Sequence, residues 1–132
     1  MEAACRGAAE AGGASLGVLL AGRGDGNRWV AESVREPDPA ARLRRLRDES
    51  DAWMFLPHGL GTMVELVWMA ESLVKGDAAP RPVVLLGDFW RPIVEMALAE
   101  ASLPEGAAAL RSCIRFAASP AEAVAAAMQS AR

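Results

Sequence analysis

The chain has 132 residues, of which 52% are hydrophobic and 23% are charged, and its formal net charge is -3. This length and composition are typical of one globular domain with a substantial core. Arginines and carboxylates are interspersed, which implies no nucleic-acid patch. No apolar run approaches the roughly 20 residues that span a membrane, and the N-terminus lacks the basic-then-apolar order of a signal peptide. We therefore expect a cytoplasmic protein without nucleic-acid or membrane partners.

Apolar runs alternate with helical patterns along the chain. The runs predict four buried strands, at 15–20, 53–56, 82–86 and 113–117. The segment 29–34 fits either a short strand or irregular structure. The helical patterns predict helices at 1–12, about 39–49, about 62–75, about 90–102 and from 120 onwards. This order predicts an α/β protein with a Rossmann-like open parallel sheet of about four to five strands and helices on both faces.

Caps and glycines mark the ends of several predicted helices. Asp38 and Ser119 are expected N-caps, each followed by a proline at the first helical position. Gly76 is expected to end the helix that contains Lys75. The alanine-rich interior of the last helix predicts close packing against the sheet.

The two cysteines, Cys5 and Cys113, stand far apart, and neither belongs to a CxxC motif or a cysteine–histidine cluster. We expect two buried free thiols, as in a reducing compartment. The residues predict no metal site and no cofactor.

The segment from Pro57 to Glu65 follows a predicted strand and opens a predicted helix. Its two glycines, Gly59 and Gly61, permit close approach of a ligand to the backbone and unusual dihedral angles. Backbone N–H groups at a helix start, together with the helix dipole, favour an anion such as phosphate, and the hydroxyl of Thr62 adds a donor. The same spacing also fits a plain strand-to-helix turn. Ligands of parallel sheets bind beyond the carboxyl ends of the strands, where this loop and the loop 22–26 are expected.

Three side chains have both a structural and a functional interpretation. Glu65 either closes a capping box with Thr62 or faces a ligand. Arg42 either serves the site or belongs to a solvated helix face, because charges there are spaced four residues apart. The spaced pairs are Asp38–Arg42, Arg44–Asp48 and Arg45–Glu49. His58, the only histidine, is either incidental or part of the anion loop.

The segment Pro57-His58-Gly59-Leu60-Gly61-Thr62-x-x-Glu65 resembles the PGGxGTxxE signature of the LOG (LONELY GUY) family, formerly labelled lysine decarboxylase-like. The similarity extends to Ser50-Asp51-Ala52, to the helix that ends at Gly12-Gly13, and to the segments 81–86 and 119–123. It implies a single LOG-like nucleotide-binding domain over residues 1–132.

Two departures from the family pattern stand out. His58 occupies a position that is usually glycine. The chain also begins where the family's first helix begins, so we expect its first β-α-β portion, with another glycine-rich loop, to be missing. Either a start codon assigned too late or a reduced domain would explain an N-terminal truncation.

The resemblance implies a nucleoside 5′-monophosphate phosphoribohydrolase, which hydrolyses the N-glycosidic bond and releases base and ribose 5-phosphate. It implies a homodimer in which Arg42 and Glu65 act at the ribose and the scissile bond. The residues expected to bind the phosphate are His58, Gly59, Leu60, Gly61 and Thr62. One alternative is a non-catalytic nucleotide or cofactor carrier of the same fold, which His58 and the missing loop favour. Another is a structural partner that pairs through an exposed sheet edge.

The older decarboxylase label has no support in the chemistry of these residues. Lys75 is the only lysine and lies at the end of a predicted helix. The expected ligand is instead a nucleoside monophosphate or a related phosphorylated small molecule.

Overall fold

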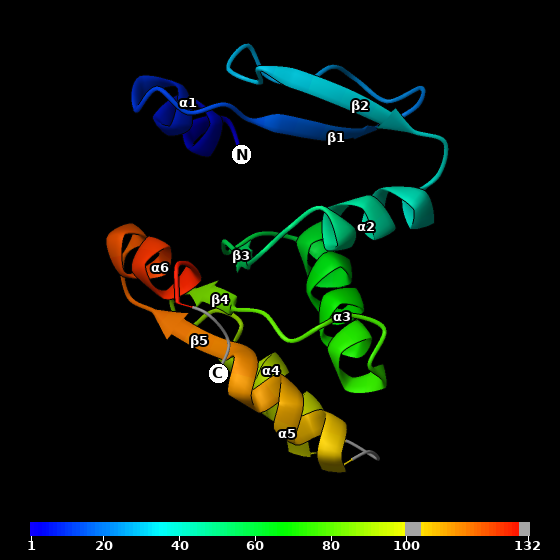
Figure 1. Cartoon of the computed structure of the whole chain (residues 1–132), viewed down its shortest axis with the longest axis vertical. Coiled ribbons are helices and arrows are strands. Elements are labelled where there is room, and N and C mark those ends of the chain that lie inside the picture. Colours follow the sequence, from blue (N-terminus) through cyan, green and yellow to red (C-terminus); the bar gives the residue numbers. More distant parts are fainter. Residues whose placement is uncertain (100–103, 130–132) are drawn as a thin grey trace. The chain divides into compact units, whose positions relative to one another are not determined.

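The computed structural model describes residues 1–99 and 104–129, which form two compact units divided between Glu49 and Ser50 (Figure 1). The first unit contains α1 (Glu2–Glu10), β1 (Leu16–Leu20), β2 (Glu32–Glu36) and α2 (Pro39–Asp48). The second contains β3 (Trp53–Phe55), α3 (Leu60–Lys75), β4 (Val83–Leu86), α4 (Arg91–Ala99), α5 (Pro104–Cys113), β5 (Ile114–Ala117) and α6 (Pro120–Ala127). The expectation of a single domain stays a prediction.

Among the described residues, five strands form two parallel sheets, one of two strands and one of three. This confirms the predicted α/β class, with the strands shared between two sheets. In the first unit, β1 pairs with β2 in a register that runs from Leu16 opposite Glu32 to Leu20 opposite Glu36. The uncertain segment 29–34 therefore contains the start of a strand that continues to Glu36.

In the first unit, charged side chains fix the ends of the elements around α2. Asp38 caps α2 by accepting a hydrogen bond from the N–H of Ala41 at 2.8 Å, as expected. Arg45 pairs with Glu49, as predicted, and also with Glu36 of β2. The hydrogen bond and charge of Glu36, with the charge of Glu49, raise the pKa of Arg45 above its usual value.

The loop 22–26 is held by Arg35 of β2. Its guanidinium donates to the carbonyl oxygens of Arg23 at 3.1 Å and Gly24 at 3.3 Å, and it pairs with Asp25. Gly22 adopts a φ of 73°, in the left-handed region that favours glycine. This loop is therefore ordered by a charged side chain of its own unit.

In the second unit, β4 lies between β3 and β5, and Phe55, Leu85 and Phe116 are in register across the three strands. Val83 and Val84 are both fully buried and point to opposite faces, because successive side chains alternate along a strand. Val84 packs with Ala117 and with Ala123 of α6, which confirms the predicted close packing of the alanine-rich helix. The three-stranded sheet is thus covered on both faces.

Helix α3 is the longest element among the described residues, and it buries Leu66, Met69, Ser72 and Leu73. It ends at Gly76, whose φ of 79° confirms the predicted glycine stop. Helix α5 was not predicted. It packs so closely on α3 that a Cβ atom on Gly106 would overlap the carbonyl oxygen of Val74.

The remaining predicted elements match the structure with small shifts. Helix α4 begins at Arg91 and is described to Ala99, and residues 100–102 of the predicted helix lie outside the described residues. Both cysteines are free. Cys113 is buried as expected, whereas Cys5 is only half-buried and its Sγ lies 3.5 Å from the amide of Asn27. Among the described residues, no helix is both long and apolar enough to cross a membrane.

Candidate functional site

The predicted anion loop follows the carboxyl end of β3, the strand that pairs with the central strand β4. Gly59 is the N-cap of α3, which begins at Leu60, two residues earlier than predicted. The N–H groups of Thr62 and Met63 donate to the carbonyl oxygen of Gly59 at 3.1 and 3.2 Å. The N-terminus of a 16-residue helix is therefore located at the predicted loop, where its dipole favours an anion.

The capping-box interpretation of Thr62 and Glu65 is wrong, because the N-cap of α3 is Gly59 and not Thr62. Thr62 is the third residue of the helix, and Glu65 is the sixth. Residues three apart on a helix are neighbours on its surface, so these two side chains share one face close to the helix start.

The glycines of the loop act through their small size. Neither has a positive φ, contrary to the expectation of unusual dihedral angles, and the φ of Gly59 is -82°. A Cβ atom built on Gly59 or Gly61 would meet no atom within 4 Å. Packing within the chain therefore does not demand glycine at either position. The open space beside the backbone is what a ligand that approaches the N–H groups requires.

The side chains around the helix start differ in exposure. His58 and Leu60 are exposed, and Thr62 and Glu65 are half-buried. Glu65 directly precedes the buried Leu66. Its backbone is therefore fixed by a part of α3 that is anchored in the core.

Arg42 lies in α2 of the first unit. Its Nε donates to the carbonyl oxygen of Val18 in β1 at 2.9 Å, and its own N–H donates to the carbonyl oxygen of Asp38 at 3.1 Å. A half-buried guanidinium bonded to a strand carbonyl is not simply a solvated surface charge. The structure thus places the residues from His58 through Thr62, and also Glu65, at the start of α3. Arg42 belongs to the other unit.

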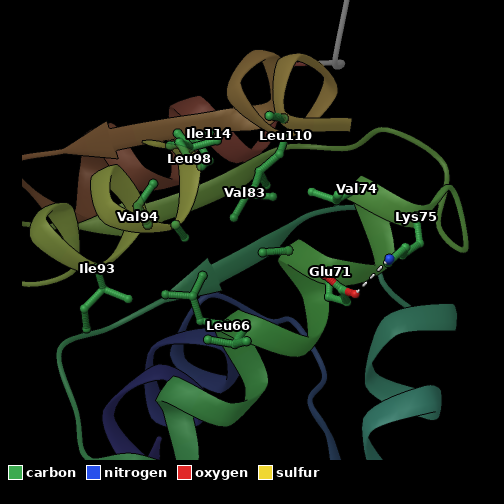
Figure 2. Close-up of a pocket in the computed structure, with 14 residues that line it drawn as sticks. Leu66, Glu71, Val74, Lys75, Val83, Ile93, Val94, Leu98, Leu110 and Ile114 are labelled. Atoms are coloured by element: carbon green, nitrogen blue, oxygen red, sulfur yellow. Dashed lines mark ion pairs between the residues drawn. The ribbon is translucent and has the colours of Figure 1, made fainter. Parts of the chain in front are cut away.

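The second unit contains a cleft that the sequence does not predict, beside the part of α3 that follows Glu65 (Figure 2). The cleft has a volume of about 300 Å³ and is lined by α3, α4, α5 and the two strands β4 and β5. Its aliphatic residues look like ordinary core residues in the sequence, so no local signal marks it. Within residues 1–99 and 104–129, no group of histidine, cysteine and carboxylate side chains is arranged to hold a metal ion.

A family model described as "possible lysine decarboxylase" matches residues 1–127. The chain belongs to this family. The match includes Arg42, the loop and Glu65, and it confirms the LOG-like resemblance drawn from the Pro57–Glu65 motif. No curated protein matches the chain.

Proposed function

We propose that this LOG-like protein is a nucleoside 5′-monophosphate phosphoribohydrolase. The observation that carries the proposal is the start of α3. The N-cap of α3 is a glycine, which has no side chain to cap the N–H groups of the first turn, and Glu65 follows within two turns. In a member of this family, such a helix start suits the 5′-phosphate of a nucleotide.

The proposed reaction needs few protein groups. The bond between C1′ and the base nitrogen breaks, water adds to C1′, and a proton passes to the departing base. The Glu65 carboxylate stabilises the oxocarbenium-like charge at C1′ or accepts the proton of the attacking water. Arg42 binds ribose hydroxyls or phosphate through its guanidinium, whose direction is set by the bond to Val18.

The proposal is tested by incubation of the full chain with AMP and detection of free adenine. We expect Glu65→Gln to lower kcat/KM by about 10²-fold or more, the effect typical of losing an acid–base group. Arg42→Ala should also lower kcat/KM, because its guanidinium would no longer bind the ribose or the phosphate. Arg44→Ala is the matched control, because Arg44 is exposed on the same helix, and it should retain activity. Turnover that survives the loss of both Arg42 and Glu65 would overturn their assignment.

The second candidate is a nucleotide-binding protein without catalysis. The exposed His58 favours it, because this side chain stands in the anion loop where the family has glycine. Calorimetry with AMP separates the two functions, since a carrier binds AMP without releasing adenine. In that case His58→Gly, which restores the family residue, is the variant in which to look for a gain of turnover.

A further inference from the structure

The cleft between α3 and α4 is distinct from the helix start that we propose as the nucleotide site. Val83 of β4 lies at its base, and Leu110 of α5 and Val94 of α4 lie along its sides (Figure 2). Neither His58 nor any residue from Gly59 to Glu65 lines it. All the described residues that line it belong to the second unit.

The space exists because three helices each place an alanine there. These are Ala70 of α3, Ala97 of α4 and Ala107 of α5. The surrounding side chains are aliphatic, and Leu66, Val83 and Leu110 are almost fully buried. Apolar side chains that face an empty space lose dispersion contacts, which lowers stability. An apolar occupant would restore those contacts and remove apolar surface from water.

Among the described residues, two charged side chains line this aliphatic cleft. Glu71 and Lys75, one helical turn apart on α3, form an ion pair of 3.8 Å, and both are more than half exposed. They lie together at one side of the cleft (Figure 2). An ammonium beside a carboxylate offers both a donor and an acceptor. A hydroxyl group matches this pair, since it can accept from Lys75 and donate to Glu71 while adding no charge.

We propose that the cleft binds a small amphiphile with an aliphatic chain and one terminal hydroxyl group. Its volume of about 300 Å³ is at the lower limit of small-molecule pockets. A helix of a second copy does not fit such a volume, and a flat partner surface does not reach the buried Val83. The aliphatic lining selects the hydrocarbon chain of the amphiphile, and the Glu71–Lys75 pair selects its hydroxyl end.

The test is titration of the full chain with 1-octanol, followed by methyl NMR shifts of leucine and valine. We expect saturable binding that strengthens about fourfold for each added methylene from 1-butanol to 1-octanol, the effect of burying one methylene group. 1-Methoxyheptane, which retains an ether acceptor but lacks the hydroxyl donor, should bind more weakly than 1-octanol. Absence of saturable 1-octanol binding to the unaltered chain would overturn the proposal.

Ala97→Phe fills the cleft and should weaken 1-octanol binding about tenfold or more, because the ring takes the space of several methylenes. Ala99→Phe is the matched control. Ala99 is also an exposed alanine of α4, but it does not line the cleft. Equal binding by the two variants would contradict the proposed location. If Ala97→Phe unfolds, Ala70→Leu provides the same test from α3. Octanol binding and AMP hydrolysis are measured separately, so either can fail alone.

Discussion

At the scale of single residues, the proposed chemistry rests on two charges that come from different elements. Arg42 is bonded to a strand carbonyl, and Glu65 is fixed by the buried part of α3. In the sequence, each of these side chains also has a purely structural interpretation. The structure rejects the capping box for Glu65, and it gives Arg42 a specific partner in Val18. The functional interpretation of each side chain stays a prediction.

If Arg42 and Glu65 act on one transition state, their effects on catalysis will not be additive. We expect the double variant Arg42→Ala/Glu65→Gln to lose little more kcat/KM than the more damaging single variant, because groups that act as a unit fail together. The measurement is kcat/KM for AMP in all four proteins. Losses that multiply across the two variants would show that the side chains act independently.

At the scale of elements, a substitution at the start of α3 should affect ligand binding and folding stability in opposite directions. We expect Gly61→Ala to raise the free energy of unfolding by about 0.5 kcal/mol, because alanine is the better helix former and its Cβ meets no atom within 4 Å. The same methyl group should weaken AMP binding about tenfold, since it occupies the space beside the N–H groups. Denaturant unfolding and calorimetry measure the two effects.

Gly7→Ala is the control for this substitution. Gly7 lies within α1, and a Cβ there also meets no atom within 4 Å. This variant should gain stability and bind AMP as the unaltered chain does. If Gly61→Ala also retained full AMP affinity, the phosphate would not approach this backbone.

The sequence was most informative where local chemistry decides the structure. Proline and the caps Asp38 and Ser119 marked two helix starts, and Ser119 accepts a hydrogen bond from the N–H of Glu122 at 3.3 Å. It was least informative where long-range packing decides. Helix α5 contains glycine and an alanine run without clear periodicity, and it is stabilised by the close contact of Gly106 with α3. The division of the strands into two sheets likewise depends on pairing between distant segments, which periodicity does not encode.

At the scale of the whole molecule, the two units differ in how completely they bury their strands. Residues Val83, Val84 and Leu85 of β4 are fully buried, whereas β1 contains no buried residue and Leu16 is 46% exposed. We expect amide hydrogens of β4 to exchange at least about tenfold more slowly than those of β1, because local opening is easier where few apolar contacts are lost. Hydrogen exchange with mass spectrometry measures this difference. Equal protection of the two strands would contradict it.

The homodimer implied by the family resemblance is a prediction that α3 allows to be tested. Leu60 and Val64 are 78% and 57% exposed and one helical turn apart, and exposed apolar surface is typical of interaction sites. We expect the 13.9 kDa chain to have twice this mass in light scattering, and Val64→Asp to return it to the monomer mass, since a charge in an apolar interface is costly. Val124→Asp is the matched control, because Val124 is also 57% exposed but lies on α6. A monomeric unaltered chain, or equal effects of the two substitutions, would remove α3 as the interface.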